Sequence, residues 1–216
     1  SQEDLNKYSL IHYPYFDPFF LTLPINKIKP TVVTVHDLIP LKFPNRFPKG
    51  VKGWFKWQVQ KFSLKGSSAI ITDSKTSKND IMEITDINEN LIHTIYLAAD
   101  EQFKTVTQKE LKQISQKYHL PESFILYVGD LNWNKNVLGL IKAFAELYKQ
   151  KKDIYLVVVG KAFLNKDLAE RMAVARLIKE LKLEKQMIFL GFVPTKDLAA
   201  LYNLAACYCQ PSFYEG

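Results

Sequence analysis

The second half of the chain alternates short apolar runs with longer helical patterns, and this alternation restricts its fold more than any other feature. Strands are predicted at residues 124–128, 154–159, 187–190 and 207–210, and helices at 137–149, 167–181 and 195–204, the last capped by Thr195. Short apolar runs bounded by Gly or Pro are typical of buried strands, and a 3.6-residue apolar period is typical of helices. Strands that alternate with helices form parallel sheets through right-handed crossovers. The second half is therefore predicted to be a parallel α/β domain.

The first half has the same character with less regular spacing. Strands are predicted at residues 8–13, 31–35, 68–72 and 91–97, with a Pro-rich loop at 38–47, a helix at 50–66, and a second helix capped by Asp73 or Ser74. Residues 98–107 are predicted to cross between two units, and a polar helix follows at about 108–119. We therefore predict two tandem Rossmann-like domains with parallel sheets, at residues 1–103 and 104–216.

The segment FILYVGDLNWNKN, residues 124–136, is the first candidate for a binding site. A strand ends at Gly129, Lys135 follows in the turn, and a helical pattern starts at Val137. This arrangement presents backbone N–H groups and a helix N-terminus to an anion, and a Lys adds a point charge. The alternative is a surface loop with a solvated Lys. On these residues alone, both interpretations stay open.

A second candidate follows the strand TVVTV at residues 31–35, which delivers His36 and Asp37 to its carboxyl end. Binding and catalytic residues of parallel sheets gather at that end. A lone His is more often structural, so the functional and structural interpretations of His36 both stay open.

The chain has 216 residues and a formal net charge of +7. This charge suits nucleic acid, an anionic membrane face or phosphorylated substrates. No nucleic-acid recognition motif is visible, so no nucleic-acid partner is predicted. In the helix at 50–66, one face is apolar and consists of Val51, Trp54, Phe55, Val59 and Phe62. Lysines lie on or beside the other face, at positions 52, 56, 61 and 65. We expect the apolar face to pack on the chain's own sheet; insertion into a membrane interface is the alternative.

Two cysteines, Cys207 and Cys209, are predicted to be small core residues in a reducing, cytoplasmic compartment, with a metal site as the alternative. No apolar run of 18 residues and no signal-peptide pattern occurs. The chain begins at Ser1 without Met and stops at Gly216 directly after a predicted strand. Both ends indicate a fragment, with both domains truncated.

Three motifs in the second half resemble the C-terminal domain of family 4 glycosyltransferases, the retaining enzymes of the GT-B fold. They are YVGDLNWNKN around Gly129, VVVGKAF around Gly160, and IFLGFVPTKDLAALYNLAACYCQPSFYEG at the end. The last is the most specific, because PSxxEG begins the E-x7-E signature of that family. In the first half, IHYPYF, TVVTVHDLIPL and ITDSKTSKNDI resemble the back part of the family's N-terminal domain. The resemblance implies a GT-B fold and a retaining hexosyltransferase.

The resemblance also implies roles for individual residues. Lys135 would contact the donor diphosphate beside Gly129, and Glu215 would hold hydroxyls of the donor sugar. His36 would lie near the transferred sugar and the reacting centre, so His36 and Glu215 are the candidate catalytic residues. Gly191, Phe192 and Val193 would lie beside the nucleobase, through backbone groups. The resemblance implies no metal and no other cofactor, and no D-x-D motif is present.

The sequence departs from the family pattern at Asp130, where many members carry an Arg that pairs with the Lys on the diphosphate. Lys161 is the predicted replacement cation. The second Glu of the signature would follow Gly216, and a Gly-rich loop of the family would precede Ser1. The resemblance therefore implies that the chain by itself lacks part of both substrate sites and is inactive alone.

Three functions follow from these observations. The first is transfer of a sugar from a nucleotide diphosphate sugar to a glycan or lipid-linked acceptor, with retention of configuration and with peripheral contact to the inner membrane face. The second is a nucleotide-sugar epimerase of the same architecture. The third is a non-catalytic basic module that binds anionic membrane surfaces.

Overall fold

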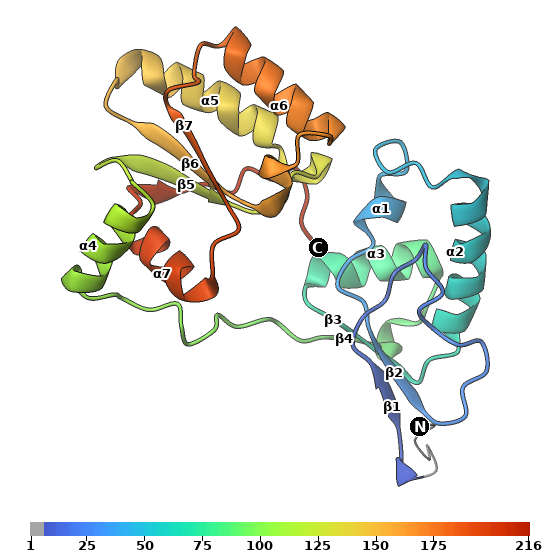
Figure 1. Ribbon diagram of the computed structural model, residues 1–216. Helices are drawn as coiled ribbons and strands as arrows, with labels where there is room; N and C mark the ends of the chain where they lie inside the picture. The colour runs from blue at the N-terminus through green and yellow to red at the C-terminus, as the bar shows by residue number, and fades with distance from the viewer. Residues whose placement is uncertain (1–6) are drawn as a thin grey trace. The chain divides into compact units, whose positions relative to one another are not determined.

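The computed structural model describes residues 7–216. The chain divides into two compact units, one comprising the residues up to Ala98 together with Glu215–Gly216, the other comprising Ala99–Tyr214. Among the described residues, each unit contains one four-stranded parallel sheet with helices in its crossovers (Figure 1). The predicted fold class, two tandem parallel α/β units, is confirmed.

The first unit has its strands in sequence order, β1-β2-β3-β4, and all neighbouring pairs are parallel. Its strands are β1 (Ile11–Tyr13), β2 (Thr31–Thr34), β3 (Ala69–Thr72) and β4 (Ile92–Thr94). Its helices are α1 (Ile39–Lys42), α2 (Gly50–Lys65), α3 (Lys75–Thr85) and the 3-10 turn η2 (Glu89–Leu91). The core of this unit joins β-branched strand residues to α2 and α3 through Val33, Ile70, Leu64 and Ile81.

One helical turn, α1, lies inside the Pro-rich stretch that was predicted to be a loop. Asp37 Oδ1 accepts a hydrogen bond from the Ile39 N–H at 2.9 Å, which starts the turn. Pro40 is tolerated there because the first turn of a helix needs no donor at that position. Lys42 at its end pairs with Glu83 at 2.5 Å and with Asp80 at 3.1 Å, which ties α1 to α3. Hydrogen bonds to Glu83 and Asp80 raise the pKa of Lys42 above its ordinary value.

The expectation that the apolar face of α2 packs on its own sheet is wrong. The buried residues of α2 are Gly53, Trp57, Gln60, Ser63 and Leu64. Of the apolar residues predicted to face inward, Val59 is partly buried, but Val51, Trp54, Phe55 and Phe62 are 74%, 47%, 61% and 68% exposed. Trp57 and Leu64 join the core of the unit. The polar Gln60 can share this inward face because the segment before β2 satisfies it: the N–H groups of Thr22 and Leu23 both donate to Gln60 Oε1 at 3.1 Å.

The second unit has the strand order β7-β6-β5-β8, again entirely parallel. Its strands are β5 (Phe124–Val128), β6 (Tyr155–Val159), β7 (Met187–Gly191) and β8 (Cys207–Tyr208). Its helices are α4 (Gln108–Lys117), α5 (Val137–Gln150), α6 (Ala169–Glu180), α7 (Thr195–Leu204) and the 3-10 turns η3 (Trp133–Lys135) and η4 (Lys161–Leu164). The N-cap of α7 is Pro194, so the predicted cap at Thr195 is its first helical residue.

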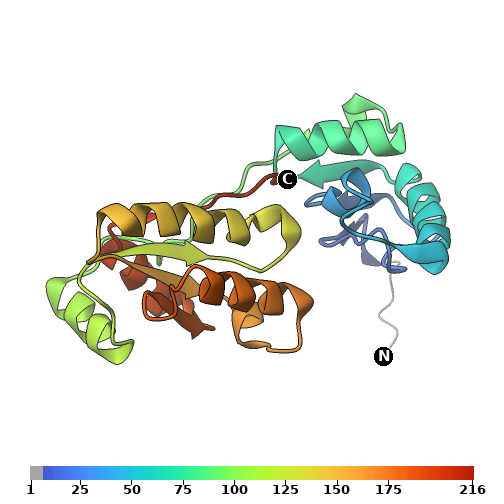
Figure 2. The ribbon, with the colours of Figure 1, turned by 90° about the horizontal axis from the view of Figure 1, so that it is seen from above.

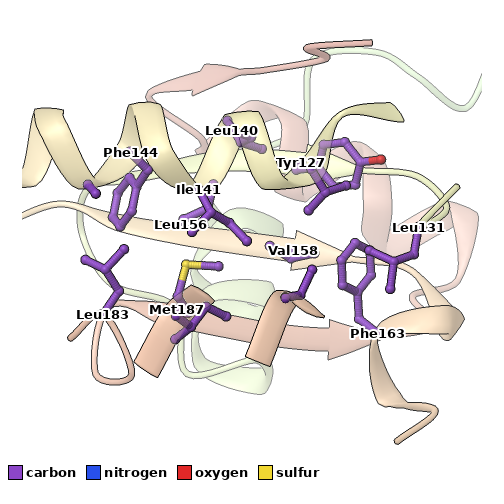
Figure 3. Close-up of a cluster of buried hydrophobic side chains, with 14 of the residues drawn as sticks. Tyr127, Leu131, Leu140, Ile141, Phe144, Leu156, Val158, Phe163, Leu183 and Met187 are labelled. Atoms are coloured by element: carbon purple, nitrogen blue, oxygen red, sulfur yellow. The ribbon is translucent and has the colours of Figure 1, made fainter. Parts of the chain in front are cut away.

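Two apolar layers hold this second sheet. Helices α5 and α6 lie side by side over one layer (Figure 2), and Figure 3 shows Leu140 and Ile141 of α5 against Leu156 and Val158 of β6. The second layer packs Leu126, Val157 and Leu201 with residues of α4 and α7. Because β5 and β6 contribute to both layers, they are apolar on both faces, as expected for central parallel strands.

An ion pair inside this unit joins α4 to α7. Lys117 Nζ and Tyr118 Oη donate to Asp197 Oδ2 at 2.5 and 2.7 Å. Burial by itself raises the pKa of Asp197, but the hydrogen bonds from Lys117 and Tyr118 outweigh it and lower that pKa. The hydrogen bond to Asp197 raises the pKa of Lys117.

Replacing Asp197 by Asn is expected to destabilise the second unit by about 1–2 kcal/mol at pH 7, because Lys117 and Tyr118 lose a charged acceptor. A carboxyl with a lowered folded pKa stabilises above its unfolded value of about 3.9, and this stabilisation is lost as the pH falls through the folded pKa. The difference in free energy of unfolding between the native and Asp197→Asn proteins, measured with urea, should therefore shrink toward zero as the pH falls to about 3. Glu146→Gln, in the exposed pair with Lys149, is the control, and an equal loss there would contradict this role.

Candidate functional site

The turn after β5 is shaped by its own side chains. Tyr127 is fully buried, and its Oη donates to the Asp130 carbonyl at 2.7 Å. A Cβ at Gly129 would lie 2.8 Å from that hydroxyl oxygen, so the hydrogen bond requires glycine here. Asp130 Oδ1 accepts from the Leu131 N–H at 2.8 Å. The carboxylate at the position where an Arg was expected therefore helps to form the turn.

Lys135 ends η3 and stands directly before the N-terminus of α5, as the sequence predicted. Asn136, the N-cap of α5, adopts a left-handed conformation with φ 52°. Its side chain lies over the first turn of α5, because a Cβ at Gly139 would approach Asn136 Oδ1 to 2.4 Å. The free N–H groups and dipole of this helix end favour an anion. Lys135 thus lies beside a helix N-terminus that is suited to a phosphate.

Two asparagines that flank Lys135 fasten its turn to residues 211–214. The Phe213 N–H donates to the Asn134 carbonyl at 2.8 Å, and Asn134 Nδ2 donates to the Tyr214 carbonyl at 3.2 Å. Asn136 Nδ2 donates to the Pro211 carbonyl at 3.0 Å.

The Trp133 and Phe213 rings stack with their centroids 5.3 Å apart, which adds an apolar contact to these hydrogen bonds. Sequence reasoning missed both asparagines. Their dense placement around Lys135 was the available signal, because a buried Asn such as Asn134, 4% exposed, requires partners.

The ends of β5, β6 and β7 meet through backbone hydrogen bonds. The Gly129 N–H donates to the Val159 carbonyl at 3.0 Å, and the Gly160 N–H donates to the Gly191 carbonyl at 2.9 Å. A Cβ at Gly160 would lie 2.2 Å from the Gly129 carbonyl oxygen, so the strand ends approach too closely for a side chain. Gly129 and Gly191, both predicted at the donor site, therefore lie with Gly160 at the carboxyl ends of β5, β6 and β7. We call these three residues the glycine edge of the sheet.

Beyond this edge, Lys161 and Phe192 lie together. Lys161 Nζ is 4.7 Å from the centroid of the Phe192 ring, and both side chains are exposed. Val193 is 5% exposed and packs in the core, so its side chain faces away from any ligand. Gly191 has φ 66°, which favours glycine. Only the backbone of Gly191 and Val193 is suited to contact a nucleobase.

In the first unit, His36 and Asp73 meet at the carboxyl ends of β2 and β3. His36 Nδ1 and Asp73 Oδ2 are 2.6 Å apart, and the His36 side chain keeps 46% exposure. Ser77 Oγ donates to the His36 carbonyl at 2.7 Å. The Asp73 carboxylate orients the imidazole ring through Nδ1, so Nε2 points away from Asp73. Histidines that contact a substrate are often oriented in this way. Asp73 was predicted only as a helix cap; Ser74 takes that role by accepting from the Ser77 N–H at 2.9 Å.

The predicted site residues are divided between the two compact units. The first unit contains His36 and Glu215, and the second contains Lys135, Lys161 and residues 191–193.

A hollow of about 730 Å³ in the second unit is lined by residues 101–106, α4 and α7, and none of the predicted donor-site residues lines it. We therefore place the candidate site at the glycine edge rather than in that hollow.

The described residues, 7–216, can be searched for metal-binding clusters and for membrane-spanning helices. No group of three or more His, Cys, Asp or Glu side chains suited to a metal ion occurs in this range. Cys207 is exposed rather than a core residue, and Cys209 is partly buried. Within the same residues, no helix has the length and apolar character needed to cross a bilayer.

The sequence matches two family models. Residues 108–216 match "Glycosyl transferases group 1", and residues 2–103 match "Glycosyltransferase Family 4". The serotype-specific mannosyltransferase WbdA of Escherichia coli is 30% identical over 205 residues, which cover 93% of this chain and 25% of WbdA. The O-antigen chain mannosyltransferase B of Escherichia coli is 29% identical, over 94% of this chain and 52% of that protein. The chain thus spans between a quarter and about half of these relatives.

Solved structures share the fold at lower identity. Anabaena Alr3699/HepE in complex with UDP-glucose superposes with a TM-score of 0.69 at 20% identity, over 85% of this chain and 47% of that one. Sucrose-phosphate synthase from Thermosynechococcus elongatus gives a TM-score of 0.69 at 22% identity, over 97% and 51%. Both support the two-unit GT-B architecture. With its second half matched by the group 1 model and its first half by the family 4 model, the chain belongs to the family 4 type of glycosyltransferases.

Proposed function

We propose that the protein transfers a hexose from a nucleoside diphosphate sugar to a glycan or lipid-linked acceptor, with retention of anomeric configuration. The observation that carries the proposal is the turn at Gly129–Asn136, where Lys135 precedes the N-terminus of α5 at the glycine edge of the sheet. Family membership supplies the reaction class, and the mannosyltransferase relatives favour mannose as the hexose.

The proposed chemistry places charge where this turn can stabilise it. The bond between the anomeric carbon and the diphosphate oxygen breaks, and both electrons leave with the diphosphate. The acceptor hydroxyl forms the new bond, and its proton passes to the leaving group. Positive groups fixed beside the diphosphate stabilise the developing charge more than they stabilise the bound donor. Lys135, Lys161 and the helix end are the groups proposed for this task.

The other roles follow the family resemblance. We propose that Glu215 holds sugar hydroxyls and that His36, oriented by Asp73, contacts the transferred sugar. Gly191 and Val193 are proposed to contact the nucleobase through their backbone, with the exposed Phe192 ring beside it.

The reaction is proposed to need no metal ion, so excess EDTA should leave the rate unchanged. A cytoplasmic location is proposed, because the free thiols of Cys207 and Cys209 suit a reducing compartment.

The test uses the full-length protein. We would titrate it with UDP, GDP and ADP, then incubate it with the matching nucleotide hexoses and a glycan acceptor, and determine the product's anomeric configuration by NMR. One saturating nucleotide and a product with the donor's configuration are expected. An inverted product would overturn retention, and conversion of the donor sugar without acceptor would favour an epimerase. Binding of no nucleotide would overturn the transferase proposal.

A further inference from the structure

The outward face of α2 forms an apolar surface that the proposed reaction does not use. With about 100° per residue, Val51, Phe55 and Phe62 share a stripe opposite the buried face of Gly53, Trp57 and Gln60. Trp54 borders this stripe, and its ring meets that of Phe55 edge to face at 5.0 Å. Together with two residues of the preceding segment, we call it the α2 surface: Phe20, Ile25, Val51, Trp54, Phe55 and Phe62. Their side chains are 47–74% exposed.

The segment before β2 is fixed against α2, so this surface is built into the fold. Gln60 accepts from two N–H groups of the segment and donates to the Leu23 carbonyl at 3.3 Å. Ser63 Oγ donates to the Pro24 carbonyl at 2.6 Å, and Lys27 Nζ donates to the Ser63 carbonyl. These bonds hold Phe20 and Ile25 beside the helix, and Lys56 Nζ lies 5.4 Å from the Phe20 ring centroid.

The segment that carries this surface is strongly basic. Residues 18–72 contain nine Lys or Arg and a single acidic residue, Asp37, which leaves a formal charge of +8. Because the whole chain carries +7, the remaining residues sum to −1. Within this segment, Lys52 and Lys56 are exposed on α2 beside the apolar stripe. Lys61 and Lys65 lie on the other side of it, and both pair with Asp86, at 3.3 and 3.6 Å.

We propose that the α2 surface binds an anionic phospholipid membrane. Aromatic side chains enter the headgroup region while flanking lysines meet anionic headgroups, which is how an interfacial helix attaches without spanning the bilayer. A second copy of the chain is a poorer occupant, because pairing would bring the exposed Lys52 and Lys56 of both copies face to face. The binding stands independently of catalysis; its use in presenting a lipid-linked acceptor rests on the proposed function.

The test is sedimentation of the full-length protein with vesicles of phosphatidylcholine alone or with 30% phosphatidylglycerol. Binding to the anionic vesicles at low salt, and much less at 0.5 M salt, is expected. Lys52→Gln with Lys56→Gln should weaken partition roughly 30-fold, since each lysine near an anionic surface contributes about 1 kcal/mol. Trp54→Ser with Phe55→Ser should weaken it at least about tenfold through lost apolar burial.

Matched controls change the same residue types elsewhere. Lys109→Gln with Lys112→Gln on α4, and Ile95→Ser with Leu97→Ser after β4, should bind as the native protein does. All four variants should keep nucleotide affinity and transfer to a water-soluble acceptor, which separates this proposal from the function proposed above.

Three results would overturn the proposal. They are equal binding to neutral and anionic vesicles, equal losses in the controls, and a lowered melting temperature of the Trp54 and Phe55 variant without any change in vesicle binding. The last would mean that protein, rather than lipid, covers the surface.

Discussion

Replacing Lys135 by Ala in the full-length protein should lower kcat/KM for transfer by about 10²–10³, the usual cost of removing one fixed group that stabilises transition-state charge. Affinity for the matching nucleoside diphosphate should fall as well, because the proposed contact of Lys135 is with the diphosphate, which the free nucleotide also carries. The neighbouring Asp130, exposed in the same turn, is negatively charged and cannot replace the positive charge that the variant loses. Initial rates and calorimetric titration with the diphosphate measure the two effects.

Lys142→Ala is the matched control, because Lys142 is exposed on α5 one turn and more beyond the N-terminus. It should change neither quantity beyond about twofold. A further comparison uses the nucleoside without phosphates, which should bind native and Lys135→Ala proteins equally. If the nucleoside were weakened as much as the diphosphate, Lys135 would support the fold of the turn rather than bind phosphate.

Replacing Gly160 by Ala should destabilise the second unit by about 3 kcal/mol, because a new Cβ must displace backbone rather than the end of a side chain. That Cβ would lie 2.2 Å from the Gly129 carbonyl oxygen and 3.0 Å from the Phe163 ring. Relief of this clash separates β5 from β6 at the edge that carries Gly129 and Lys161, so nucleotide affinity should fall too. Amide exchange of β5 and β6 across a urea series measures the loss.

Gly66→Ala is the contrasting variant. Gly66 has φ −83°, and its Cβ would approach only the flexible end of Lys27 at 3.4 Å and the Ser63 carbonyl at 3.5 Å. Its stability should stay within about 0.5 kcal/mol of native, because alanine adopts this conformation freely. A Gly160→Ala protein as stable as Gly66→Ala would show that the strand ends can separate without cost, contrary to the close approach described above.

Periodicity predicted the strands and crossovers because these depend on local pattern: an apolar run such as residues 155–159 has few alternatives once helices flank it. The orientation of α2 could not be predicted this way. Its apolar stripe is real, but the inward face combines Trp57 and Leu64 with Gln60, whose amide finds partners in a segment about 37 residues earlier.

The candidate site was predictable to a similar degree. Lys135 and the glycine edge follow from a strand, a turn and a helix that are adjacent in sequence. The partner of His36 does not, because Asp73 lies 37 residues away and meets it only when β2 pairs with β3. The same holds for Asn134 and Asn136, whose acceptors are 80 and 75 residues distant.

The bonds between Asn134, Asn136 and residues 211–214 also limit how the chain length can vary. Residues 207–209 pair with β5, and Pro211, Phe213 and Tyr214 are hydrogen-bonded to Asn134 or Asn136. The chain therefore cannot absorb an added or missing residue before Glu215. A conservative substitution inside this segment would leave the position of Glu215 unchanged. Deletion or insertion of one residue would instead shift a different side chain into that position. Related sequences should therefore vary here in residue type while keeping the number of residues constant.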